Sequence, residues 1–312
     1  MMPFRLIITL TVLLASISSA VAKEYHVYYL GGQSNMDGYG KVSELTGATR
    51  ARQEKVMIFH GSSSPDGSRA RGAGLWAPLR PGHGYDFRSD GKTNSYGTRF
   101  GCELTFASEI KRLKPDENIA IIKYSRGGTS IAIEAARHYG CWHPDFRDGD
   151  ADGKGINQYD HFLATLRRAF EVRDIDGDGE TDQLIPAGIV WMQGESDAGF
   201  EVPAKEYGSN LAHLMDLFRA AFRTDDLPVA VGRISDSKPN GKRLWPYGDI
   251  VRKQQETYCT NDSNAILVLS TDDYGYSDVA HYDSQGYLDL GTQFARAVHS
   301  LQRPRNVTTT PE

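Results

Sequence analysis

The sequence predicts an α/β fold in which helices cover both faces of one parallel sheet. Short apolar runs typical of buried strands alternate along the chain with amphipathic stretches typical of helices. Parallel strands need long crossover connections, which are usually helical, so this regular alternation indicates a series of βαβ units. A chain of 312 residues can also bury a full core within a single domain.

The predicted strands are short apolar segments, several of which end at glycine or at polar residues. The first, Glu24–Leu30, is rich in tyrosine and valine and enters the turn at Gly31-Gly32. The others follow at intervals that leave room for a helix between most neighbours. They are Lys55–His60, Asn118–Tyr124, Ile185–Met192, Leu227–Ile234 and Ala265–Leu269.

The predicted helices carry apolar residues three and four positions apart. They are Thr98–Leu113, Gln158–Val172, Ala204–Phe222, Tyr247–Tyr258 and Ser284–Leu301. Between the second strand and the first helix, the segment Gly61–Asn94 is polar, glycine-rich and without clear periodicity. It predicts a long loop that forms one wall of a binding site.

The N-terminus resembles an export signal. Arg5 precedes the apolar run Leu6–Ala15, and the small residues around Ala22 fit a cleavage site. The apolar run is too short to cross a bilayer, although an uncleaved anchor is the alternative. We expect a secreted or periplasmic protein after removal of residues 1–22, with its domain at residues 23–303 and a short flexible tail at 304–312.

The charge limits the classes of partner, and the cysteine content limits the metal and redox chemistry, that the sequence indicates. The 35 basic and 40 acidic residues give a formal net charge of −5, which argues against nucleic acid or an anionic membrane as the main partner. Cys102, Cys141 and Cys259 show no CxxC spacing, so zinc or redox chemistry is not indicated. Their odd number leaves either one disulfide and one thiol or three thiols, and the sequence does not fix the pairing.

Polar motifs follow several predicted strands at their carboxyl ends, where ligands bind in such sheets. Ser34 lies on a glycine-rich turn after the first strand, where its hydroxyl is free to attack and its own N–H can face an oxyanion. The turn at Gly127-Gly128 and the amide of Gln193 offer further donors. Near the C-terminus, Asp278 precedes His281 by three residues, so the aspartate can hold one ring nitrogen while the other faces the serine.

Taken together, GQSNM, the Gly127-Gly128 turn, WMQGESD and the DxxH before the last helix resemble the motifs of SGNH hydrolases. The chain is similar to the sialate O-acetylesterase-like branch, which includes carbohydrate esterase family 6 and its acetylxylan esterases. The resemblance covers about Tyr25 to Leu301. It implies a three-layer α/β/α flavodoxin-like fold with a parallel central sheet, and removal of acetyl groups from acetylated carbohydrate, either xylan or a sialic acid.

The resemblance also implies roles for individual residues. Ser34 would be the nucleophile, His281 the general base and Asp278 the residue that orients the imidazole. The Ser34 N–H, a glycine N–H from Gly127 or Gly128, and the Gln193 side chain would form the oxyanion hole. Glu195 would support the site or replace Asp278 as the acid partner of His281.

The implied chemistry proceeds through an acetyl-enzyme and requires no cofactor for catalysis. Two alternatives stay open. One is a short-chain acyl esterase acting on non-carbohydrate esters. The other is a carbohydrate-binding protein without turnover, because fold alone does not fix function.

Two acidic segments resemble calcium-binding loops and could hold a structural ion. In the first, Asp174, Asp176, Asp178 and Asp182 occupy positions one, three, five and nine, with glycine at position six, but Ile185 stands where a glutamate is usual at position twelve. In the second, Asp148, Asp150 and Asp152 give the same DxDxDG beginning. The alternative is a solvated turn held by hydrogen bonds from aspartate side chains.

Overall fold

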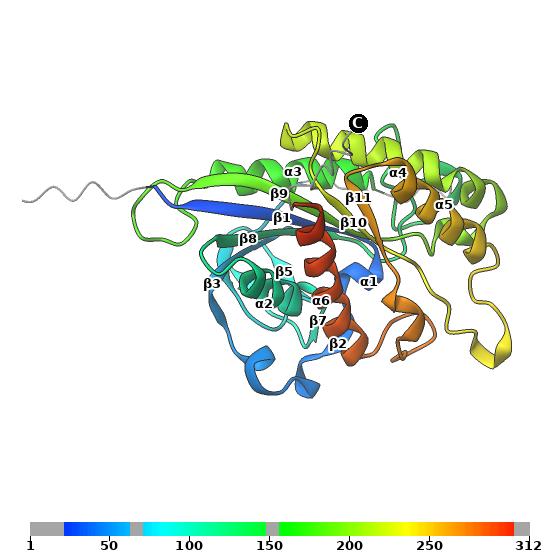
Figure 1. Ribbon diagram of the computed structural model, residues 1–312, viewed down its shortest axis with the longest axis horizontal. Helices are drawn as coiled ribbons and strands as arrows, with labels where there is room; N and C mark the ends of the chain where they lie inside the picture. The colour runs from blue at the N-terminus through cyan, green and yellow to red at the C-terminus, as the bar shows by residue number, and fades with distance from the viewer. Residues whose placement is uncertain (1–21, 63–70, 148–155, 303–312) are drawn as a thin grey trace, which may run out of the picture.

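The computed structural model describes residues 22–62, 71–147 and 156–302. Its core is a seven-stranded sheet between two layers of helices, as expected, with the strand order β11-β10-β9-β1-β8-β3-β4. Figure 1 shows α3 (Gln158–Glu171), α4 (Glu201–Phe222) and α5 (Gly248–Asn261) on one side of the sheet, and α2 (Glu103–Leu113) and α6 (Ser284–Leu301) on the other.

The strands lie close to their predicted positions and start or end within a few residues of them. Their bounds are β1 Glu24–Gly32, β3 Gln53–His60, β8 Asn118–Ser125, β9 Gln183–Met192, β10 Val229–Gly232 and β11 Ala265–Val268. In β1, Tyr28, Tyr29 and Leu30 are all completely buried, because this strand is central and has helices on both faces.

Two adjoining strands meet at an irregularity that explains a proline in the middle of the sheet. The register between β1 and β9 shifts where Val27 pairs with Pro186 and Tyr28 pairs with Gly188. Proline lacks a backbone N–H, so within a sheet it is confined to edges and bulges. The bulge here lets β9 keep its place beside β1 despite Pro186.

The segment Gly61–Asn94 is not entirely a loop, which corrects the prediction. It contains β4 (Trp76–Leu79), which pairs antiparallel with β3 at the edge of the sheet, so the sheet is mostly rather than wholly parallel. Pro78 is compatible with an edge position but obscures the strand in the sequence. A second short strand, β5 (Arg88–Ser89), pairs with β6 (Asn94–Ser95).

The predicted helix Thr98–Leu113 begins later than expected. Its first residues form β7 (Arg99–Phe100), which pairs with β2 (Gly40–Lys41), and α2 starts at Glu103. The last helix has its predicted bounds, because the carboxylate of Asp283 accepts a hydrogen bond of 2.8 Å from the Gly286 N–H at its N-terminus.

All three cysteines are free thiols, with Cys102 and Cys141 buried and Cys259 partly buried. Within the described ranges, no helix has the length and apolarity required to cross a membrane. Residues 1–21 of the predicted export signal, the predicted tail at 304–312, and Asp148, Asp150 and Asp152 lie outside the described residues, so those three interpretations stay predictions.

Candidate active site

The polar motifs meet at one cavity beyond the carboxyl ends of β1, β8 and β9. Its volume is about 620 Å³, within the range of small-ligand sites. Ser34, Gly127, Gly128, Glu195 and His281 all line it. The strand ends therefore bring together residues separated by up to about 250 positions in the sequence, as the parallel sheet predicts.

His281 and Asp278 form a pair at the rim of this cavity. The Nδ1 atom of His281 lies 2.8 Å from Oδ2 and 3.0 Å from Oδ1 of Asp278. Asp278 Oδ1 also accepts hydrogen bonds of 2.8 Å from the backbone amides of Ala280 and His281. Partial burial would raise the pKa of Asp278, but these hydrogen bonds outweigh it and lower the pKa. Asp278 thus stays ionised and holds Nδ1, which leaves Nε2 free to act.

Ser34 is the first residue of the short helix α1 (Ser34–Asp37), directly after β1. It is 9% exposed and lines the cavity with His281. Among the described residues, no direct hydrogen bond joins the Ser34 side chain to His281. Catalytic hydrogen bonds are often long in the ligand-free state and shorten when substrate binds.

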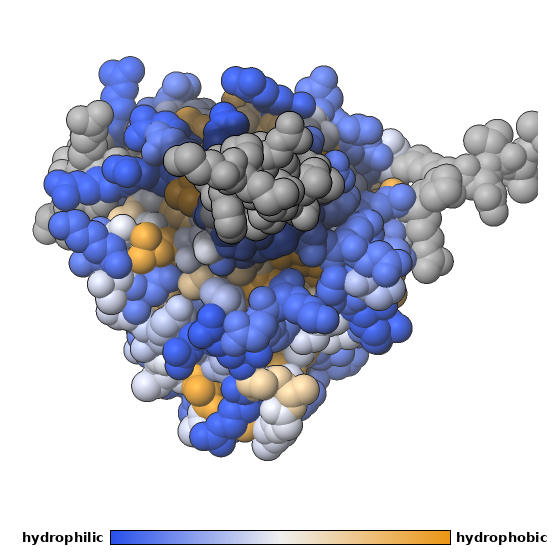
Figure 2. Space-filling view, turned by 90° about the vertical axis from the view of Figure 1, so that its left-hand side faces the viewer, coloured by the Kyte–Doolittle hydropathy of each residue, from blue (hydrophilic) through white to orange (hydrophobic). Residues whose placement is uncertain are grey.

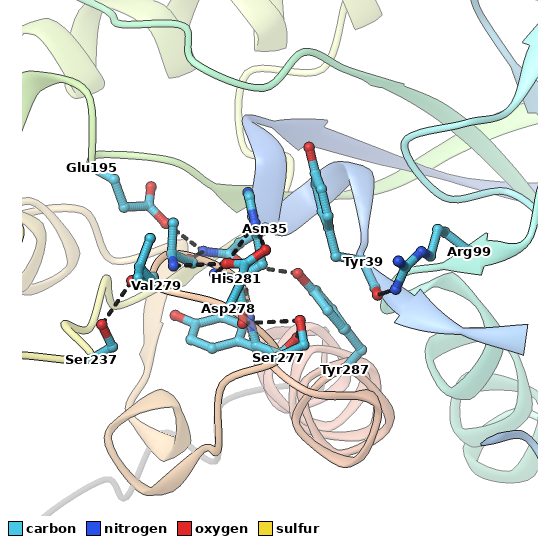
Figure 3. Close-up of polar contacts among 12 residues, drawn as sticks. Asn35, Tyr39, Arg99, Glu195, Ser237, Ser277, Asp278, Val279, His281 and Tyr287 are labelled. Carbon is cyan, nitrogen blue, oxygen red and sulfur yellow. Dashed lines mark hydrogen bonds and ion pairs between the residues drawn. The ribbon is translucent and has the colours of Figure 1, made fainter. Parts of the chain in front are cut away.

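Asn35 connects the serine turn to the histidine loop. Its Nδ2 donates to Glu195 Oε1 at 2.8 Å and to the Ala280 carbonyl at 3.2 Å. Its Oδ1 accepts from the Tyr287 hydroxyl at 2.9 Å, so the amide lies between Glu195 and Tyr287 (Figure 3). The side chain of Asn35 therefore ties the backbone beside Ser34 to the backbone beside His281, a role that the sequence does not predict.

Among the described residues, no hydrogen bond or ion pair joins Glu195 to His281, and Glu195 Oε1 accepts instead from Asn35. It is 1% exposed, and its Oε2 has no hydrogen-bond partner in the described part of the chain. Burial raises the pKa of Glu195, and the Asn35 hydrogen bond opposes this only in part. Of the two acids considered for the partner of His281, only Asp278 lies against the imidazole.

Gln193 lies behind the cavity, which corrects its predicted position as an oxyanion donor. The side chain is completely buried, and its Nε2 donates to the Thr129 carbonyl, Gln33 Oε1 and Asp197 Oδ2 at 3.0, 3.1 and 2.7 Å. An amide nitrogen has only two hydrogens, so none is available to a substrate in this arrangement.

Asp197 holds the loop that follows β8. Its carboxylate accepts hydrogen bonds from the backbone amides of Ile131 and Ala132, at distances from 2.9 to 3.2 Å. Burial raises the pKa of Asp197 to about 6, and these donors limit the rise. Gln193 and Asp197 together fix the backbone that follows Gly128. These two residues of the WMQGESD motif therefore support the loop that lines the cavity.

The two glycines after β8 are required by close approach. A Cβ on Gly127 would lie 3.1 Å from the Ser34 Cβ, and one on Gly128, whose φ is +76°, would lie 2.4 Å from the Tyr139 ring. The Gly127 N–H is directed to the carboxyl of Asp37. Burial raises the pKa of this carboxyl, and the hydrogen bond from Gly127 opposes the rise only in part. The remaining candidate oxyanion donors at the cavity are the backbone amides of Ser34 and Gly128.

Tyr39 stacks on the imidazole of His281. The two ring centroids are 3.6 Å apart with an interplanar angle of 5°, and Tyr85 stacks on Tyr39 at 4.5 Å and 7°. Because His281 covers the centre of one face of Tyr39, Tyr85 must occupy the other face. The result is a three-ring stack that fixes the plane of the imidazole.

This stack gives a testable prediction for Tyr39. An aromatic face attracts a cation with about 0.5–2 kcal/mol, so the Tyr39 ring would stabilise a protonated His281 during a reaction in which it takes a proton. We expect Tyr39→Leu to lower kcat for ester hydrolysis by about threefold to thirtyfold and Tyr39→Phe to retain it. An equal loss in both variants would show that the hydroxyl, rather than the ring face, is what matters.

Other cavity residues were not singled out by the sequence motifs. The segment Gly61–Asn94 does form a wall, as predicted, through Tyr85, Phe87 and Arg88, and Arg126 and Arg137 line the cavity as well. Behind this wall the ammonium of Lys123 is fully buried and donates to Glu103, at 2.8 Å, and to the Asp37 and His83 carbonyls. It thereby anchors the end of α1.

Comparisons with known proteins agree with this fold. A solved structure of a protein from Arabidopsis thaliana has a similar fold, with 22% sequence identity, a TM-score of 0.61, and 90% of this chain and 99% of that chain covered. A carbohydrate acetylesterase from Xanthomonas citri has 19% identity and a TM-score of 0.59, with 88% of this chain and 56% of that chain covered. NanS has 14% identity and a TM-score of 0.58, with 90% of this chain and 98% of that chain covered. At these identities they show the fold alone. No curated protein matches the sequence.

The family described as carbohydrate esterase, sialic acid-specific acetylesterase, matches residues 24–300. This range contains β1, which leads to Ser34, and nearly all of α6, which follows His281. The chain therefore belongs to the sialic acid-specific acetylesterase family of carbohydrate esterases.

Proposed function

We propose that this protein is a secreted serine esterase that removes O-acetyl groups from carbohydrate through an acetyl-enzyme on Ser34. The observation that carries the proposal is the cavity itself, which Ser34 and His281 both line while Asp278 holds Nδ1 of the histidine. Family membership supports the acetylesterase activity. Secretion is supported by the sequence of residues 1–22, and membership of carbohydrate esterase family 6 stays a prediction.

The reaction follows from these positions. His281 Nε2 takes the proton of the Ser34 hydroxyl as its oxygen attacks the acetyl carbonyl, and the Ser34 and Gly128 amides receive the oxyanion. The intermediate collapses, His281 gives its proton to the sugar oxygen, and the sugar alcohol leaves. Water then attacks the acetyl-enzyme by the same route and releases acetate, so these steps need no cofactor.

The charges of the cavity favour an acidic sugar. Arg88, Arg126 and Arg137 line it. The cavity carboxyls include Asp37 and Glu195, and burial raises the pKa of both. A sugar carboxylate would be attracted to such walls, so we propose an acetylated sialic acid as the substrate in preference to neutral acetylated xylan.

Acetate release from three esters tests the proposal. We expect turnover of an O-acetylated sialic acid, acetylated xylo-oligosaccharide and p-nitrophenyl acetate. A charge-assisted contact of about 1.5–3 kcal/mol predicts a kcat/KM for the sialic acid ester about tenfold to a hundredfold above that for the xylan ester. Equal values would count against recognition of the carboxylate. No turnover of any ester, combined with glycan binding, would support the non-catalytic alternative.

A further inference from the structure

The acidic loop between α3 and β9 lies far from the cavity. It is the green loop at the left-hand end of the sheet in Figure 1, beside the start of β1, whereas α1 lies near the other end. This end of the molecule is covered mainly by hydrophilic residues (Figure 2). Asp174, Asp176 and Asp182 each offer one carboxylate oxygen, and these three oxygens lie within 4.8 Å of one another.

Within this cluster, Asp182 is the residue whose carboxylate most needs a ligand. Asp182 is 7% exposed, and its Oδ2 accepts a hydrogen bond of 2.8 Å from the Ile175 N–H. Its Oδ1 is buried and has no hydrogen-bond partner within the described ranges. A buried carboxylate oxygen without a donor or a cation is unfavourable, and the neighbouring carboxylates repel it further. Burial, followed by the charges of Asp176 and Asp178, raises the pKa of Asp182.

The backbone of the loop keeps the carboxylates turned inward. Asp174 accepts hydrogen bonds from the amides of Gly177, Asp178 and Gly179 at 2.7, 3.1 and 2.8 Å. Gly179, at the sixth position, has a φ of +92°, which a residue with a side chain rarely adopts. The loop is thus closed around the first carboxylate, as in calcium loops with ligands at positions one, three, five and nine.

We propose that this loop binds one Ca²⁺ ion through the carboxylates of Asp174, Asp176 and Asp182. Ca²⁺ takes six to eight oxygen ligands, and the carboxylate of Asp178 and backbone or water oxygens are at hand to complete the set. The ion supplies the partner that Asp182 Oδ1 lacks. Because the loop joins α3 to β9 next to β1, calcium stabilises this end of the sheet and takes no part in ester hydrolysis.

Lys23 is the competitor for the ion. Its ammonium forms ion pairs with Asp176 and Asp178, and among the described residues no ion pair or hydrogen bond joins it to Asp182. The single positive charge of Lys23 neutralises only part of the negative charge of the four carboxylates in the loop. Ca²⁺ carries two positive charges and accepts more oxygen ligands. Calcium is therefore expected to displace Lys23 from Asp176.

Calcium titration of the purified protein, stripped of metal with a chelator, tests the proposal by calorimetry and melting temperature. At a free Ca²⁺ concentration of about 100 times Kd, binding should raise the melting temperature by about 5 °C. Asp182→Asn should weaken calcium binding by about tenfold or more and remove the rise. Lys23→Gln should bind calcium more tightly than the unmodified protein, because the competing charge is gone.

The matched control is Asp226→Asn, at an exposed aspartate outside the loop, which should bind calcium normally. If Asp182→Asn does not fold, the more exposed Asp178→Asn takes its place. The proposal is overturned by the absence of heat and of a melting shift up to about 10 mM Ca²⁺. It is equally overturned if Mg²⁺ stabilises as much as Ca²⁺, or if Lys23→Gln unfolds more easily and calcium does not restore it, since Lys23 would then be the resident cation.

Discussion

Replacement of Ser34 by alanine is expected to abolish acetate release almost completely. Removing the nucleophile of a serine hydrolase lowers kcat by about a thousandfold to a millionfold, because the residual rate comes only from the oxyanion donors and binding. The change removes one hydroxyl from a residue at the start of α1, so the fold and the affinity for substrate should survive. The measurement is kcat and KM for the same esters, with binding of the sugar determined separately.

The cavity offers rival serines, which make the experiment sharper. Ser62, Ser125 and Ser196 line it as well. We expect Ser196→Ala to keep kcat within about tenfold of the original, since the Ser196 contact given by the structure is made by its backbone N–H. A rapidly quenched reaction should carry the acetyl group on Ser34. Loss of activity in Ser196→Ala but not in Ser34→Ala would assign the nucleophile elsewhere.

The sheet could be predicted from the sequence because each of its central strands is buried on both faces. Such strands are continuous apolar runs, as in β1 and β8, and the chemistry follows them at the carboxyl end. β4 was missed because it is short, contains Pro78 and owes its existence to pairing with β3. An edge strand that depends on a distant partner leaves little periodicity of its own.

The candidate site was predictable to the extent that it depends on position along strands and loops. Ser34 and His281 line one cavity, and Asp278 reaches its histidine through local DxxH spacing. The direction in which a side chain points after a strand ends is a tertiary property. Position along the chain therefore predicts Gln193 in the cavity, whereas its amide turns back to Thr129 and Asp197.

The sequence also does not predict which residues fix the geometry of the site. Asn35 gains its role only when Glu195, Ala280 and Tyr287 converge on it from distant segments. Tyr39 gains its role only when His281 stacks on its ring. Both follow closely after Ser34 in the sequence, so the signal that could have found them is their nearness to that serine, just after β1.

Replacement of Asp278 by asparagine is expected to separate the two acids that the sequence left open. An asparagine would still lie against His281 Nδ1 but would favour the wrong tautomer and would not stabilise the imidazolium. The expected loss in kcat is about a hundredfold to ten-thousandfold, smaller than for a deeply buried aspartate because 48% of the Asp278 side chain is exposed. The matched variant is Glu195→Gln, which keeps an oxygen for Asn35 and should stay within about tenfold of the original.

The pH dependence of these variants gives a second and independent discrimination. Because hydrogen bonds lower the pKa of Asp278, it stays ionised to a lower pH than an ordinary aspartate, and a general base must be unprotonated to act. Activity should therefore fall on acidification in both the original protein and Glu195→Gln. Should Glu195→Gln instead lose more activity than Asp278→Asn, or lose its acid limb, the buried carboxyl of Glu195 would be the acid that acts with His281. The Asn35 hydrogen bond would then have to break during turnover, since it holds the one Glu195 oxygen that has a partner.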